Sequence, residues 1–161
     1  MLEQQETILV QFFQHAHHRA EGFLMEFQEE LEQGKVEGAL LERAAESIRQ
    51  HMYVEEELLF PLVETQLAEP IADLRDDHGR VTDLIAAVQA LGGAGAAVPR
   101  LQQETTRLMN FLAAHSAKED MGVYPDIVAF LGPARTQAVL RESDGVEPPA
   151  GWVCLRRRAP A

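Results

Sequence analysis

The 161-residue sequence is short of several residue classes, and each shortage excludes a kind of protein. It has a single cysteine, Cys154, so no disulfide can form within the chain. No apolar run approaches the roughly 18 residues that a membrane-spanning helix requires. Lysine and arginine number 14 against 26 aspartates and glutamates, and the resulting formal charge of −12 argues against a nucleic-acid-binding surface. We therefore expect a soluble protein without membrane or nucleic-acid contacts.

The N-terminal sequence, MLEQQETILVQFF, lacks the basic segment and the long apolar segment of a secretion signal. A lone cysteine also fits a reducing compartment, in which disulfides are rare. We therefore expect the protein to be cytoplasmic.

Aromatic residues make up only 6% of the chain and runs of β-branched residues are few, which favours helices over strands. Apolar residues instead recur at helical spacing in four long segments, at about residues 3–33, 39–66, 70–91 and 100–131. Glycine-containing breaks at residues 34–38 and 92–99, and Pro70 at the start of the third segment, separate them. A kink or local loosening of the second segment is expected at Pro61. The sequence therefore predicts an all-α fold, an antiparallel up-down-up-down four-helix bundle with a short C-terminal extension.

A shorter helix is expected at residues 133–142, so we assign the bundle to residues 1–142. Residues 143–161 are rich in proline and glycine and form the predicted C-terminal tail. We interpret this tail as a frayed end that carries solvated charges. The alternative is a docking element formed by Trp152 and Arg156 to Arg158, and ligand-dependent protease protection would separate the two interpretations.

One block of sequence occurs twice. His51 to Pro61 reads HMYVEEELLFP, and His115 to Pro125 reads HSAKEDMGVYP. In each copy a glutamate follows the histidine by four residues, so both side chains project from one face of a helix, one turn apart. Imidazole and carboxylate are the ligand pair that iron, zinc and manganese accept. The repeat therefore predicts two helices that deliver ligands to a shared metal centre.

A lone histidine on an apolar stripe precedes each block: His17 before the first and His78 before the second. Such a histidine more often makes a hydrogen bond in the core than binds a metal. Here, however, the same order occurs in both halves of the chain, and a buried cluster of four imidazoles and two carboxylates would be costly without a cation. We therefore predict a metal site formed by His17, His51, Glu55, His78, His115 and Glu119.

Neighbouring residues offer alternatives. His15 could replace His17 as a ligand if the helix register is shifted by half a turn. Glu56 and Asp120 are interpreted as supporting or surface groups. Tyr53 is expected to point away from the site, and Tyr124 is assigned to packing. Four methionines are expected to fill the core around the site: Met25, Met52, Met109 and Met121.

The six predicted ligands, with the LFP and VYP endings of the two blocks, resemble the hemerythrin-like (HHE cation-binding) family over roughly residues 10–130. The resemblance implies a non-haem di-iron centre with two irons per chain, bridged by Glu55, Glu119 and an oxo or hydroxo group. Oxygen-carrying members have a fifth histidine four residues from the one on the third helix, but here Leu74 and Thr82 occupy those positions. Fewer protein ligands leave more open positions, which favours reactivity or sensing over reversible oxygen storage.

We therefore expect a di-iron protein that binds or reacts with O2, NO or peroxide in a stress response or in sensing. One alternative is an iron- or oxygen-sensing module without turnover. Another is a zinc or mononuclear site of structural role, although six ligands suit two metals better than one four-coordinate zinc. No nucleophile triad, phosphate loop or nucleotide motif is apparent in the sequence, which leaves open whether the chain is an enzyme.

Overall fold

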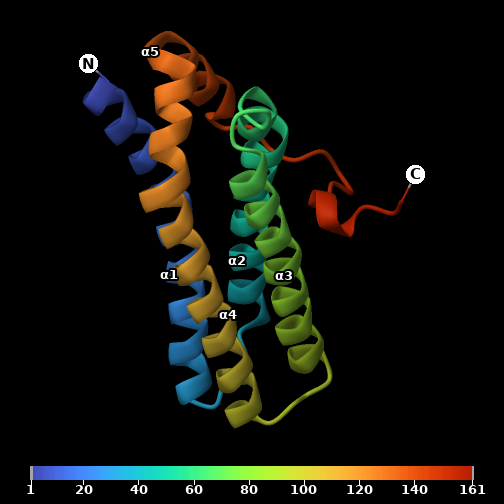
Figure 1. The fold of residues 1–161 in the computed structure, drawn as a ribbon. Helices are drawn as coiled ribbons and strands as arrows, with labels where there is room; N and C mark the ends of the chain where they lie inside the picture. The colour runs from blue at the N-terminus through green and yellow to red at the C-terminus, as the bar shows by residue number, and fades with distance from the viewer. Residues whose placement is uncertain (1, 161) are drawn as a thin grey trace.

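Four long helices run antiparallel along a common axis in the computed structural model, which describes residues 2–160 (Figure 1). The helices alternate in direction because short connections join them. Within the described residues there is no strand, so the predicted all-α four-helix bundle is confirmed. The four bundle helices are α1 (Leu2–Glu32), α2 (Gly38–Tyr53), α3 (Ala68–Gly93) and α4 (Val98–Lys118). A fifth helix, α5 (Tyr124–Ser143), follows α4.

Each of the four long helices packs against two neighbours. Helix α1 contacts α2 and α4, and α3 contacts the same two helices, so the bundle closes on itself. Helix α5 continues from α4 and packs along α1. It contains a break at Gly132, whose φ of 74° favours glycine, so the separate helix predicted from residue 133 is the second half of α5. No helix among the described residues is long and apolar enough to cross a membrane.

The two repeated blocks form widened π-helical turns. One, η1 (Val54–Leu59), follows α2, and the other, η3 (Glu119–Val123), follows α4. In each, the amide of the residue before the block's proline bonds to the carbonyl of the glutamate five residues earlier. A proline in a regular helix clashes with the carbonyl four residues before it, and the wider turn relieves this clash. Pro61 lies in a short 3-10 turn, η2 (Phe60–Leu62), so the local loosening expected there is found, but helical structure ends at Leu62 rather than near residue 66.

The interior is divided into two apolar clusters. One contains Phe13, Phe60, Leu74 and Ile127, and the other contains Leu24, Phe27, Val88 and Leu108. Along every long helix the predicted ligands lie between residues of the first cluster and residues of the second. The polar site is therefore enclosed at both ends by apolar packing.

The methionine prediction is wrong for two residues. Met52 is buried beside the site, but Met25 and Met121 are exposed by 54% and 80%. Met25 follows the fully buried Leu24, and consecutive residues of a helix face different directions.

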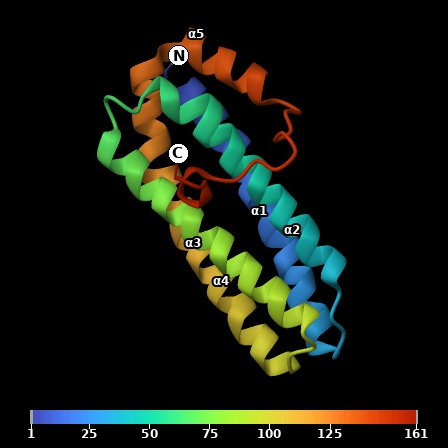
Figure 2. The same ribbon diagram turned by 90° about the vertical axis from the view of Figure 1, so that its right-hand side faces the viewer.

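The segment after α5 does not fray. Figure 2 shows it crossing α2 and ending in a short turn, η4 (Leu155–Arg157), beside α3. Cys154 is buried, and the Trp152 ring packs edge-on against Tyr53 with 5.3 Å between ring centroids. The interpretation of the tail as a frayed end is therefore wrong for residues 143–160, and Ala161 lies outside the described residues. The tail carries apolar side chains that find apolar surface on the bundle, which offsets the entropy lost on ordering it.

Candidate metal centre

All six residues predicted as ligands are brought together in the middle of the bundle. Each is at most 8% exposed, and both glutamates are fully buried. Their potential ligand atoms form two groups, with the atoms of each group within 4.8 Å of one another. Glu119 belongs to both groups. The first group is Glu55, His78, His115 and Glu119, and the second is His17, His51 and Glu119.

The spacing of the repeated blocks accounts for the contacts within each block. The Nε2 atom of His51 lies 3.3 Å from Oε2 of Glu55, and Nε2 of His115 lies 2.6 Å from Oε1 of Glu119. In both blocks the histidine lies in the last turn of a regular helix and the glutamate lies in the π turn that follows. The four-residue spacing keeps the two side chains on one face, as the sequence predicted.

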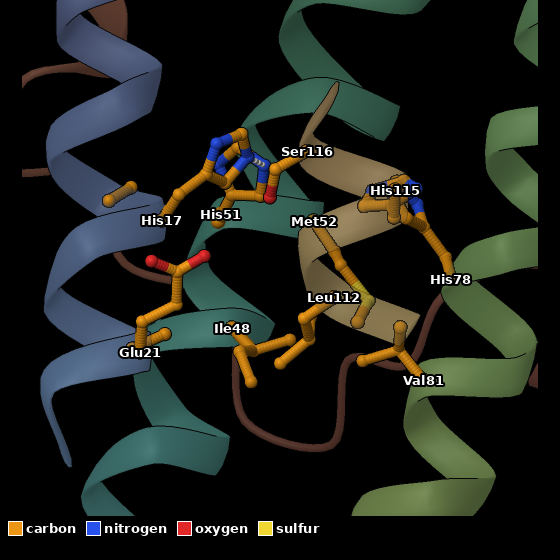
Figure 3. Close-up of a pocket in the computed structure, with 12 residues that line it drawn as sticks. His17, Glu21, Ile48, His51, Met52, His78, Val81, Leu112, His115 and Ser116 are labelled. Carbon is orange, nitrogen blue, oxygen red and sulfur yellow. Dashed lines mark hydrogen bonds between the residues drawn. The ribbon is translucent and has the colours of Figure 1, made fainter. Parts of the chain in front are cut away.

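Contacts between helices join the two blocks. Nε2 of His17 lies 2.9 Å from Nε2 of His51 and 2.8 Å from Oε2 of Glu119. On the opposite side, Nε2 of His78 lies 3.1 Å from Oε2 of Glu55. Figure 3 shows the first two imidazoles meeting on one side of the site and those of His78 and His115 on the other. The four histidines therefore direct nitrogen atoms towards two carboxylates that they share.

The carboxylates change the pKa of the histidines. Burial alone lowers the pKa of His115, but the charge of the adjacent Glu119 and the hydrogen bond with Asp77 raise it to about 9. Burial also lowers the pKa values of His17 and His78. The nearby carboxylates outweigh this effect, so both pKa values are raised. The pKa of Glu119 lies well below its usual value, because the surrounding histidines outweigh its burial.

Several ligand atoms at the centre are buried without a hydrogen bond. Among the described residues, Nε2 of His78, Oε2 of Glu55 and Oε1 of Glu119 are shielded from solvent, and their short contacts are not aligned as hydrogen bonds. Buried polar atoms in proteins are nearly always paired, so such a group needs an explanation. A divalent cation would accept lone pairs from these atoms. The residues present therefore fit a metal of the type that binds imidazole and carboxylate.

Two imidazoles are held from behind by further carboxylates. Nδ1 of His78 lies 2.7 Å from Oε1 of Glu56, and Nδ1 of His115 lies 3.2 Å from Oδ2 of Asp77. Lys118 donates to the same oxygen of Asp77 at 2.7 Å. Glu56 is thus a supporting group, one of the two roles expected for it, whereas Asp77 was missed. Asp77 directly precedes His78 in the sequence, and no periodic pattern there indicates a contact with α4.

Nδ1 of His17 and Nδ1 of His51 make no hydrogen bond within residues 2–160. Asp120 approaches the first of these at 4.0 Å and receives a hydrogen bond from Gln14, so it flanks the site without joining either group. His15, the alternative to His17, is exposed and belongs to neither ligand group.

Tyr124 takes part in the site and does more than pack. Its hydroxyl oxygen lies 2.6 Å from Oε1 of Glu55 and 3.0 Å from Oε2 of Glu119. The single hydroxyl proton can serve one bond at a time, and the shorter contact is to Glu55. Burial and the two carboxylates raise the pKa of Tyr124 well above its ordinary value, so the hydroxyl keeps its proton. Tyr53, in contrast, points away from the site, as expected, and packs against Trp152 of the tail.

Two cavities reach the site. A small one, of about 20 Å³, touches all four imidazoles and is otherwise lined mainly by apolar side chains such as Ile48, Met52 and Leu112 (Figure 3). This volume admits a molecule of water size. A larger one, of about 420 Å³, runs between α1, α2 and the end of α5 and is lined by His15, Arg19 and His51.

The model of the hemerythrin HHE cation binding domain matches residues 8–127, which include all six predicted ligands and both π turns. No curated protein and no solved structure matches the chain. Two buried histidine and glutamate groups that share one carboxylate suggest the binuclear metal site typical of hemerythrins. Because the match spans most of the sequence, the chain belongs to the hemerythrin HHE cation-binding domain family.

Proposed function

We propose that the protein holds two irons and binds or reacts with O2, NO or peroxide. The sharing of Glu119 between two buried ligand groups is the observation that carries this proposal. A single four-coordinate metal would leave part of this donor set unused and buried. Two metals use all six side chains, which is why we favour them over a single structural zinc.

The contacts suggest which residues would hold each iron. Glu55, His78, His115 and Glu119 form one set, and His17, His51 and Glu119 form the other. Glu119 contacts histidines of both sets, and Glu55 lies near His51 as well as near His78. These contacts support the proposal that both carboxylates would be shared between the two irons. When bound, a pair of irons would supply Lewis-acid sites that can also exchange electrons with a small ligand.

The protein side chains would control access and proton position. The apolar side chains around the small cavity exclude bulk water and leave room for a molecule of about water size. The set that contains His17 and His51 has fewer protein ligands and is approached by both cavities, so we assign ligand entry to this side. The Tyr124 hydroxyl keeps its proton next to the two carboxylates. Tyr124 belongs to the apolar cluster at one end of the site, whereas the apolar lining of the small cavity belongs to the cluster at the other end.

The iron content of purified variants tests this assignment. We expect two irons per chain in the wild type and a large loss when Glu55→Ala and Glu119→Ala are combined, because both bridging groups are removed. The matched control combines Glu42→Ala and Glu69→Ala, two exposed glutamates outside both groups, and should keep two irons. Full iron loading of the first variant would disprove the assignment.

A further inference from the structure

Residues 144–158, which we call the strap, are attached to the bundle along their length. Arg49 of α2 donates to the carbonyl oxygens of Pro149 and Trp152, at 2.8 and 3.0 Å. The Trp152 indole donates to Glu57 at 2.9 Å. Three consecutive arginines then form ion pairs with acidic residues of η1 and α3: Arg156 with Asp76, Arg157 with Asp83 and Arg158 with Glu57.

One contact of the strap continues into the metal centre. The backbone N–H of Leu155 donates to Oε2 of Glu56 at 2.7 Å, and Oε1 of the same carboxylate lies 2.7 Å from Nδ1 of His78. Glu56 is only 4% exposed. Its two oxygens thus face opposite ways, one towards the strap and one towards an imidazole of the first ligand set. Without the strap, one oxygen of a buried carboxylate would lose its donor.

Gly79 gives a second, independent sign that the strap is fitted to this place. It lies in the middle of α3, directly after His78, where glycine is less favourable than alanine. A Cβ atom at Gly79 would lie 3.0 Å from Cβ of Arg156, an approach too close to accept without a shift. The contact atom is next to the strap backbone, so the strap itself would have to move. The glycine permits the close approach of the strap to the helix.

We propose that Glu56 is a positioning residue for His78 and that the strap holds Glu56 in place, so that strap docking and metal binding are coupled. This inference rests on the proposed metal centre. Supporting groups of this kind fix the orientation of a ligand imidazole, and their loss typically lowers metal affinity by about 10- to 100-fold. Coupling between two binding equilibria is reciprocal, so metal binding must also strengthen docking of the strap.

The coupling is specific to one histidine. His115, the other imidazole held from behind, is supported by Asp77, which receives its hydrogen bond from Lys118 of α4 and none from the strap. Release of the strap should therefore affect His78 and leave the support of His115 intact. A segment that responds to the state of the metals in this way is what a sensing role would require.

Leu155→Pro tests the coupling, because proline removes the one N–H that reaches Glu56. Leu155 is the first residue of η4, where proline is tolerated, and the extended ψ of 155° at Cys154 suits a residue that precedes proline. Leu155→Ala is the matched control, since it keeps the N–H and shortens only a partly exposed side chain. Affinity for Fe(II), measured anaerobically against a chelator, should fall about 10-fold or more in the proline variant and stay unchanged in the alanine variant.

Trypsin cleavage at the strap arginines supplies a readout that does not depend on activity. In the wild type, Fe(II) should slow cleavage after Arg156 to Arg158, as followed by mass spectrometry, and in Leu155→Pro it should not. If the wild type binds iron and the proline variant matches it in affinity and protection, the coupling is disproved while the metal centre stands.

If the wild type binds no iron, the proposed function fails, and the positioning of His78 is decided in the metal-free protein. Its imidazole nitrogen signals, assigned by ¹⁵N NMR, should then shift in Leu155→Pro and not in Leu155→Ala. Identical signals in all three proteins would disprove the positioning role of Glu56.

Discussion

Tyr124 and Glu55 lie 69 positions apart in the sequence, yet the phenol oxygen and a carboxylate oxygen meet at 2.6 Å in the interior. The same hydroxyl lies 3.0 Å from Glu119. One aromatic side chain, placed by the second π turn, thus contacts both carboxylates of the repeated blocks.

Tyr124→Phe should destabilise the metal-free protein by about 1–3 kcal/mol, because a buried carboxylate loses its donor. Urea unfolding with the metal removed measures this change in the free energy of unfolding. Tyr53→Phe is the control, since the Tyr53 ring packs against Trp152 outside the centre. Equal stability of Tyr124→Phe and wild type would mean that the hydroxyl does not pair with Glu55 or Glu119.

Gly79→Ala and Gly22→Ala should differ although both replace a glycine within a helix. An added Cβ meets nothing within 4 Å at Gly22, so the better helix former should raise the free energy of unfolding by about 1 kcal/mol. At Gly79 the new Cβ would push Arg156, and the gain should be cancelled or reversed. Fluorescence of Trp152, the only tryptophan, should change in Gly79→Ala alone. An equal gain in both variants, with unchanged fluorescence, would show that the strap does not press on α3.

Metal affinity should rise with pH between 7 and 9. The carboxylates raise the pKa of His78 well above its usual value and that of His115 to about 9, so these two imidazoles hold protons at neutral pH in the metal-free protein. A metal must displace those protons. At pH values below the pKa of such an imidazole, the apparent metal affinity therefore rises about tenfold per pH unit for each proton displaced. Calorimetric titration with Fe(II) in two buffers of different ionisation enthalpy counts the protons released. An affinity that stays constant across this range would contradict the protonated state.

The helices and six central residues were predictable because each rests on a short-range pattern. Apolar spacing indicates a helix, and four residues place His51 and Glu55 on one face whatever the rest of the chain does. The preference for Glu119 over Asp120 as the central carboxylate followed from the same spacing and agrees with the ligand groups. Burial in the bundle then brings the four helical faces together.

The supporting contacts were not predictable from such patterns. Glu56 meets Leu155 over 99 positions, and Asp77 meets His115 over 38, and neither pair leaves a periodic trace in the sequence. The strap was misjudged because its proline and glycine content indicates an irregular backbone, which was taken for a loose one. Irregular segments can still be ordered when their side chains find partners, as Trp152 and Cys154 do.

Metal analysis with an optical spectrum, taken on anaerobically purified protein before and after exposure to air, tests the central claim most directly. The shared Glu119 and the two ligand groups predict two irons per chain and a near-ultraviolet absorption band that develops with air. One zinc per chain with no spectral response to air would contradict the di-iron centre.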